Sequence, residues 1–315
     1  MPKISRQQRN KQLLIAGLLI LFGLVSVLYL FYKVPSELIL LNIRLPRYVL
    51  TLLTGVVLAA VGNVYQMLLN NPLAEPYILG TSSGSALFAI TAYILGFSYL
   101  MPLFGFVGAM LAMTLVWFIA RKGSRVNTVK LILSGIIVSM ICSSIISLYI
   151  YLFPNQITVI MSILMGSLNH VFSNNEWYIF LALTLVSVLL LIYQFFLTNS
   201  LNVISTGELT AHSLGVDIAK IRKRVFVTTS LLIAIVTSYA GIIGFVGLII
   251  PHIVRMMFGD NLRNNYFITM LVGGVFLLLC DFVAYHISPF GELPVGILTT
   301  LIGSVFFIIL LRKRV

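Results

Sequence analysis

The sequence predicts an all-α integral membrane protein with about ten transmembrane helices and both termini in the cytoplasm. Of its 315 residues, 60% are hydrophobic and only 9% are charged, whereas an ordinary soluble domain has about a quarter charged residues. Its apolar runs have roughly the 20 residues that a helix needs to cross a bilayer, and they are apolar on every face. Such runs exclude the short alternating strands of a membrane β-barrel. We therefore expect residues 1–315 to form a single transmembrane domain.

The expected spans follow one another with short connections. The apolar runs cover residues 13–32, 48–69, 78–97, 99–120, 129–152, 177–198, 225–241, 242–259, 266–287 and 295–311. Two boundaries, at 97–99 and near 241, have almost no polar linker. The first run follows four basic residues, as in a signal peptide, but it is too long for one and lacks a cleavage site. We expect it to remain as the first span.

Basic residues set the expected orientation. Ten spans with both ends inside place seventeen of the twenty Lys and Arg residues on the cytoplasmic side, in agreement with the positive-inside rule. The other three, Lys33, Arg44 and Arg47, fall in the first external loop. Merging one weakly separated pair would reverse the side of every later loop. Topology thus explains the net charge of +12, and we expect a lipid bilayer and no nucleic acid around the chain.

Two polar stretches flank the second span. Arg44 and Arg47 at its outer mouth are either interfacial arginines that extend toward water or a basic contact for an acidic partner. The second stretch, 66–84, contains Asn71-Pro72 and a second proline four residues later. At membrane depth such a loop must be buried in protein or line a cavity, and an ordinary tight inner turn is the alternative.

The longest hydrophilic stretch, residues 205–224, is expected on the cytoplasmic side. Thr206 or Thr210 could cap a short helix, Gly215 could end it, and Asp217 could begin another. A solvated loop could carry the same charges, but it would not need apolar side chains. We therefore expect a compact knob that uses the apolar residues against a partner surface; these residues are Leu209, Leu214, Val216, Ile218 and Ile221.

Two further stretches lie inside the last spans. In 240–255, glycines spaced by three and Pro251 predict a kinked helix that can move. His252 is either a packing residue or a proton carrier, and the scattered histidines predict no metal site. In 281–296, Asp281 lies within a span, where an acid is a functional candidate; hydroxyls or amides could instead cap it. We expect Cys142 and Cys280 to be packing residues.

Taken in order, these stretches resemble the permease subunits of FecCD-type ABC importers for iron-siderophore complexes, haem and cobalamin. The resemblance covers nearly the whole chain. It rests on RLPR at 44–47, NPLAEP at 71–76 followed by LGTSSG, GELTAHSLGV at 207–216, GFVGLIIPHIVR at 244–255 and ELPVGILTTLIGSVFF at 292–307.

The resemblance implies ten spans, a second permease subunit as homodimer or paralogue heterodimer, two ATPase subunits at the cytoplasmic face and an extracytoplasmic substrate-binding protein. Arg44 and Arg47 resemble the site that docks the binding protein, although related permeases can have a further arginine where this chain has Tyr285 and His286. Segment 161–169 resembles the short helix that narrows the outer gate. The ATPase-coupling residues would be Gly207, Glu208, Leu209, Ala211, Ser213, Leu214, Gly215 and Val216. The gate and translocation-path candidates are Asn71, Pro72, Gly166, Gly244, Gly247, Pro251 and His252.

The chain lacks a GxxxxGK[ST] segment, so it cannot hold nucleotide phosphates in that way. We expect a permease rather than an enzyme, in a bacterial cytoplasmic membrane, with no metal or cofactor of its own and with ATP and magnesium in the partner ATPase. Its substrate would be a ferric siderophore or haem, with cobalamin as the alternative. A secondary transporter driven by protons through Asp281 is the main rival, and no pair of acidic residues or histidines supports an intramembrane enzyme.

Overall fold

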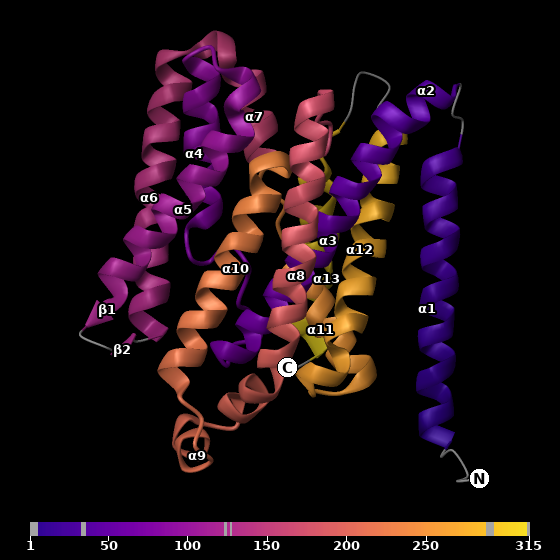
Figure 1. The fold of residues 1–315 in the computed structure, drawn as a ribbon, viewed down its shortest axis with the longest axis vertical. Coiled ribbons are helices and arrows are strands. Elements are labelled where there is room, and N and C mark those ends of the chain that lie inside the picture. Colours follow the sequence, from indigo (N-terminus) through magenta and orange to yellow (C-terminus); the bar gives the residue numbers. More distant parts are fainter. Residues whose placement is uncertain (1–5, 33–35, 123–124, 127, 288–292, 314–315) are drawn as a thin grey trace.

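The computed structural model describes residues 6–32, 36–122, 125–126, 128–287 and 293–313. Within these ranges the chain is a helical bundle with one small hairpin (Figure 1). The elements are α1 (Arg6–Phe31), α2 (Glu37–Ile39), α3 (Leu45–Leu68), α4 (Thr81–Ile94), α5 (Met101–Ala120), β1 (Arg121–Lys122), β2 (Arg125–Val126), α6 (Thr128–Leu152), α7 (Ile157–Met165), α8 (Asn174–Ser205), α9 (Glu208–Ser213), α10 (Ile218–Ala240), α11 (Val246–Phe258), α12 (Leu262–Ile287) and α13 (Val295–Lys313).

Each predicted apolar run coincides with a helix, and seven helical segments are long and apolar enough to cross a membrane. The runs that correspond to α4, α11 and α13 are not among the seven. Both weakly separated pairs are divided in the structure. Gly96, with φ +83°, follows α4, and irregular backbone separates α10 from α11. The all-helical membrane fold is confirmed.

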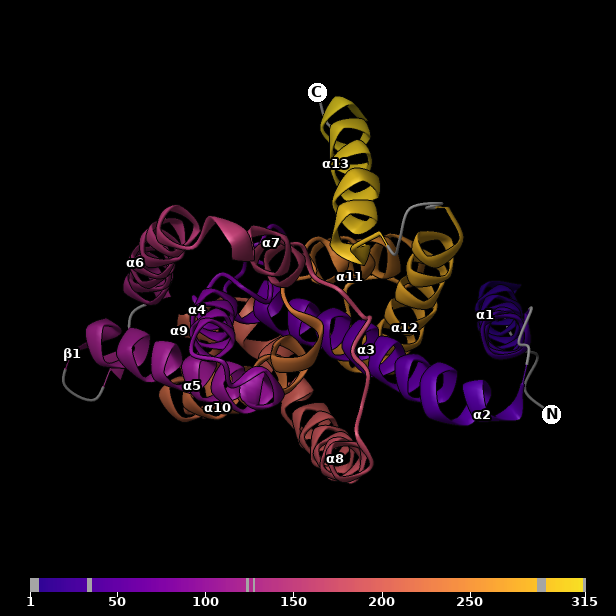
Figure 2. The ribbon, with the colours of Figure 1, turned by 90° about the horizontal axis from the view of Figure 1, so that it is seen from above.

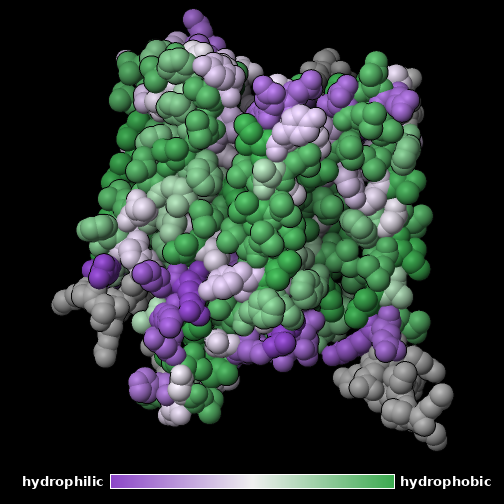
Figure 3. All heavy atoms as spheres, in the orientation of Figure 1, coloured by the Kyte–Doolittle hydropathy of each residue, from purple (hydrophilic) through white to green (hydrophobic). Residues whose placement is uncertain are grey.

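The surface has the pattern that a bilayer requires. Figure 3 shows an apolar band between two hydrophilic edges. The start of α1, the β1–β2 hairpin, α9 and the corner between α11 and α12 lie at the same, lower end in Figure 1. The start of α10, which follows α9, holds a further basic cluster, Lys220, Arg222, Lys223 and Arg224. Together these segments contain most of the Lys and Arg residues, so the charge is concentrated at one end of the bundle.

The central helix is α3, which packs against α8, α10, α11 and α12. Glycines let it approach its neighbours closely. A Cβ atom at Gly55 would lie 2.5 Å from the carbonyl oxygen of Gly273 in α12, and one at Gly62 would overlap the carbonyl oxygen of Gly247 in α11. The absence of side chains at Gly55 and Gly62 therefore allows tight helix packing. Close backbone contact replaces the hydrophobic driving force that is missing between helices in lipid.

Helix α1 lies at the periphery, where Figure 2 shows it beside α12. Polar bonds tie both of its ends to the bundle. At one end, the Lys11 ammonium group donates to the Phe258 carbonyl oxygen at the end of α11 (3.1 Å). Toward the other, the Ser26 and Tyr48 hydroxyls are 2.8 Å apart. Such bonds matter here because only 11% of the apolar window of α1 is buried in the protein.

The contact between α3 and α11 leads to a stability prediction. We expect Gly62→Ala to lower the melting temperature of the protein in lipid nanodiscs, because overpacking costs about 1–3 kcal/mol. Gly17→Ala in α1 is the matched control, since a Cβ atom there meets no atom within 4 Å. Equal melting temperatures for the two variants would contradict the proposed close contact.

Candidate translocation and coupling site

Most of the gate and translocation-path candidates lie at the break between α10 and α11 or in α11 itself. α10 ends before Gly241 (φ +67°), and α11 begins after Phe245, whose φ of +69° is unusual for a residue with a side chain. The Ile243 amide donates to the Tyr77 hydroxyl (3.1 Å), and the Phe245 amide donates to the Glu75 carboxylate (3.1 Å). The loop between α3 and α4 therefore satisfies amides that the helices cannot.

The segment after α7 lies on another side of the same break. The Ser167 amide donates to the Ala240 carbonyl oxygen (3.0 Å), and the Gly296 amide at the start of α13 donates to the Gly166 carbonyl oxygen (3.4 Å). A Cβ atom at Gly166 would overlap the carbonyl oxygen of Ile242. Gly166 thus lets three backbone segments meet.

Helix α11 contains Pro251, as predicted, and α3 compensates for it. Proline has no N–H group, so the Gly247 carbonyl oxygen loses its helical donor. The Gln66 amide nitrogen donates to this oxygen (3.2 Å), while its amide oxygen accepts a hydrogen bond from Arg255. His252 is buried, and its ring lies 6.1 Å from the Phe306 ring.

Asn71 and Pro72 lie away from the break, at the lower end of the bundle. They border a polar cavity of about 480 Å³ that also reaches the end of α8 and the corner between α11 and α12. Asn71 accepts a hydrogen bond from the Leu73 amide (2.9 Å). The cavity is lined by Gln66, Met67, Asn70, Asn71, Pro72, Asn202, Ser205, Arg255, Asp260 and Asn261.

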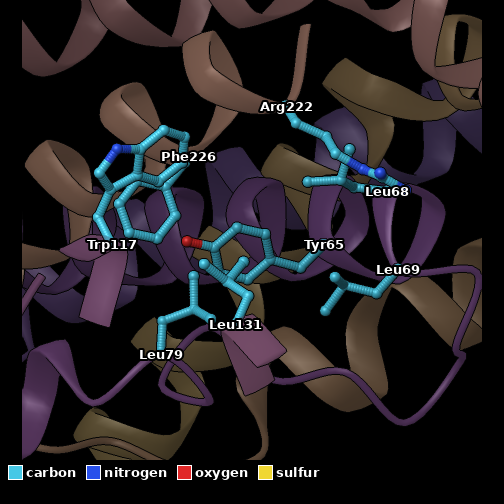
Figure 4. Close-up of a pocket in the computed structure, with 8 residues that line it drawn as sticks. All are labelled: Tyr65, Leu68, Leu69, Leu79, Trp117, Leu131, Arg222 and Phe226. Carbon is cyan, nitrogen blue, oxygen red and sulfur yellow. The ribbon is translucent and has the colours of Figure 1, made fainter. Parts of the chain in front are cut away.

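A second cavity lies between α3, α5, α6 and α10 (Figure 4). Its volume is only about 10 Å³, which is about the space for one water molecule. It is lined by Tyr65, Leu68, Leu69, Leu79, Trp117, Leu131, Arg222 and Phe226. It is too small to admit a chelate.

The predicted knob is present as α9. Gly215 follows this helix with φ +76°, and the Asp217 side chain accepts a hydrogen bond from the Lys220 amide (3.0 Å) at the start of α10. The prediction of a threonine cap is wrong. Thr206 ends α8 and Gly207 precedes α9 with φ +128°, a value that favours glycine.

The apolar side chains of α9 divide into two sets. Ala211 is buried, and its carbonyl oxygen accepts a hydrogen bond from the Val216 amide (3.0 Å). Leu209 and Leu214 are instead 87% and 66% exposed, at an end of the bundle that is otherwise hydrophilic (Figure 3). The exposed Ser213 hydroxyl donates to the Leu209 carbonyl oxygen (3.0 Å). The two leucines are available to a partner surface.

At the opposite end, Arg47 and Asp281 form a buried ion pair. The guanidinium donates to both carboxylate oxygens, at 2.9 and 2.8 Å, and the two residues are 7% and 1% exposed. The Tyr29 hydroxyl donates to the same carboxylate. Asp281 is therefore not the lone acid that the sequence suggested; its partner lies 234 residues away.

Arg44 and Tyr285 cover this ion pair. Arg44 is half-buried and donates to the Tyr29 carbonyl oxygen at the end of α1 (3.0 Å). The guanidinium groups of Arg44 and Arg47 each lie 5.0 Å from the centre of the Tyr285 ring. The Tyr285 ring thus lies beside both guanidinium groups, and His286 packs against it.

The sequence alone gave no role to Glu75, Tyr77 or Gln66, although all three lie in the polar stretch 66–84. The two prolines indicated buried loop backbone, but nothing in the sequence showed which amides the loop would meet. Within the residues that the structure describes, no group of three His, Cys, Asp or Glu side chains could hold a metal ion.

Comparisons with known proteins cover almost the whole chain. The model of the FecCD transport family matches residues 12–313. The chain is 38% identical to the cobalamin import system permease BtuC of Halobacterium salinarum, over 89% of the chain and 74% of that protein. It is 33% identical to the hemin transport system permease HmuU of Yersinia pestis, over 87% and 83%.

A solved structure has the same architecture. It is a metal-chelate type ABC transporter in an inward-facing conformation, 33% identical in sequence, with a TM-score of 0.85 over 95% of this chain and 99% of that one. Because the family model and the relatives agree along nearly the full length, the chain belongs to the FecCD transport family.

Proposed function

We propose that the chain is the permease subunit of an ABC importer that carries an iron chelate, either a ferric siderophore or haem, across a bacterial plasma membrane. The hemin permease among its relatives and the metal-chelate transporter with the same fold support this substrate class. Cobalamin is the alternative, supported by the cobalamin permease. Ten spans with both termini inside remain part of the proposal, supported by the collection of basic segments at one end.

The observation that carries an ATP-driven mechanism is the protruding α9 with its exposed Leu209 and Leu214. A chain without a nucleotide-binding motif needs an external source of energy, and two exposed leucines at a hydrophilic end need a partner. We assign the coupling role to Gly207–Val216, where a partner ATPase with its ATP and magnesium would push. Glycines on both sides of α9, at 207 and 215, give the segment its compact shape.

The translocation path would lie between this permease and a second copy or a paralogue. Figure 2 shows α13 projecting from the side of the bundle. Its exposed apolar residues, which include Leu301, Val305 and Ile308, need lipid or another subunit as a neighbour. The break at 241–245, Gly166 and α11 with its proline would form the part of the path that moves.

Docking of an extracytoplasmic binding protein would centre on Arg44. An arginine has five N–H donors. Arg44 donates one hydrogen bond to the Tyr29 carbonyl oxygen, and its guanidinium group has further donors for a carboxylate of a partner protein. The Arg47 guanidinium already has a carboxylate partner in Asp281. In this arrangement Arg47 supports the docking surface from behind, and Tyr285, which is 40% exposed, forms part of it.

The rival secondary transporter needs Asp281 to take up and release protons. The Asp281 carboxylate is instead bound inside the protein by two nitrogens of the Arg47 guanidinium and by the Tyr29 hydroxyl. The geometry therefore favours a structural role for Asp281.

The coupling role of α9 can be tested by making its exposed leucines polar. We expect Leu209→Ser/Leu214→Ser to lower ATP-driven chelate uptake roughly tenfold or more, since truncating interface anchors costs on the order of 2 kcal/mol. Insertion and melting temperature should stay unchanged because neither side chain is buried. Leu38→Ser, at a leucine that is 72% exposed at the other end, is the control. Normal uptake in the double variant would refute the assignment.

The ion pair gives a second test. Asp281→Asn should destabilise the protein by about 3–5 kcal/mol, because it leaves a buried arginine without its carboxylate. The variant Arg47→Met/Asp281→Leu should recover much of this loss, as measured by thermal unfolding in nanodiscs. A proton relay would require the opposite pattern: Asp281→Asn as stable as the wild type but inactive in uptake.

A further inference from the structure

The loop between α3 and α4 enters the protein instead of turning at its surface. Pro72 and Leu73 are exposed, whereas the residues that follow, from Ala74 to Gly80, are buried or half-buried. A Cβ atom at Gly135 in α6 would lie 2.9 Å from the Leu79 Cα atom. The loop is therefore packed directly against the backbone of α6.

The same loop also presses against α11. The Pro76 ring occupies the space where Gly247 would have a side chain, and the Gln66 amide nitrogen lies 3.4 Å from the Ala74 carbonyl oxygen. The loop is thus fixed from α3, α6 and α11 at once. Backbone that is not helical is tolerated at membrane depth only when protein surrounds it in this way.

From this position the loop offers two side-chain acceptors to two backbone N–H donors of the α10–α11 break, and the acceptors are as far apart in sequence as the donors. Glu75 and Tyr77 are two residues apart, and so are the amides of Phe245 and Ile243 that they bind. An amide in a lipid-like interior has no water to replace a lost acceptor, so each bond is costly to leave unmade. The positive φ of Phe245 also requires surroundings that hold it.

We propose that Glu75 and Tyr77 are positioning residues that hold the α10–α11 break in the conformation seen here, and that release of their two hydrogen bonds is the step that lets α11 move relative to α10. The positioning part stands on the geometry alone. The movement part rests on the proposed function, since it assigns the released state to the transport cycle.

Packing alone is the competing explanation, with Pro76 and Gly247 fixing the break and the two hydrogen bonds adding nothing. The two explanations differ in what single-atom changes do. If the hydrogen bonds hold the break, removing an acceptor speeds hydrogen exchange at the amide that it binds. If packing holds it, removing one acceptor atom leaves both amides as protected as before.

Hydrogen exchange in nanodiscs, followed at the Ile243 and Phe245 amides, tests the positioning role. We expect Tyr77→Phe to speed exchange at Ile243, and Glu75→Ala to speed it at Phe245, each about fivefold or more, because each change leaves one buried amide without its acceptor. Glu75→Gln keeps an acceptor oxygen and should exchange like the wild type. Tyr99→Phe and Glu37→Gln, at two exposed residues away from the break, are the controls.

Unchanged exchange in both Tyr77→Phe and Glu75→Ala would overturn the proposal, as would exchange in Glu75→Gln as fast as in Glu75→Ala. Protection of the α12 amides serves as the check on folding. If Glu75→Ala loses that protection, the variant is misfolded and only Tyr77→Phe is used for the test. Tyr77→Phe removes a single oxygen atom and so disturbs the packing least.

Chelate uptake tests the movement part. Glu75→Ala should alter the maximal uptake rate severalfold with little change in the substrate concentration for half-maximal uptake, and Glu75→Gln should restore it. Wild-type uptake in Glu75→Ala with accelerated exchange at Phe245 would refute the movement part. If the wild type itself transports no chelate with its ATPase, the proposed function fails, while the exchange result still decides the positioning role.

Discussion

The structure depends on one constraint: backbone N–H and C=O groups at membrane depth must find partners inside the protein. Continuous helices meet it along most of the chain. Where the helices stop, at 241–245, side chains from other segments provide the acceptors, and where Pro251 removes a donor, Gln66 replaces it. The irregular segments therefore cannot be placed independently, because each one completes the hydrogen bonding of another.

The same constraint explains the glycines at the contacts. A side chain can reach a backbone group in a neighbouring helix only if the two backbones lie close, and Gly62 permits this approach between α3 and α11. It also explains the polar ties of α1, which has little buried surface. The buried ion pair of Arg47 and Asp281 then joins α3 and α12 beside the end of α1. Rigid contacts around a break that is held by few bonds are what a gate with discrete states needs.

Much of this architecture could be predicted because its signals are local. Apolar runs predicted every long helix, charge separated the two ends of the bundle, and glycine with proline marked the irregular segments. The pairings could not be predicted, since Asp281 finds Arg47 and Glu75 finds Phe245 across 234 and 170 residues. A single sequence has no pattern that shows which residues so far apart in the chain will be in contact. The threonine caps failed for a different reason: a glycine conformation at 207 begins α9 without any side-chain cap.

In the proposed cycle, the loop between α3 and α4 controls the break between α10 and α11. The most direct test of this control is a pair of cryo-electron microscopy structures of the complete transporter in nanodiscs, one without nucleotide and one trapped with ATP. If the loop controls the break, the Tyr77–Ile243 and Glu75–Phe245 hydrogen bonds will be within about 3.5 Å in one state and broken in the other. Both bonds intact in both states, with α10 and α11 moving as one body, would contradict it.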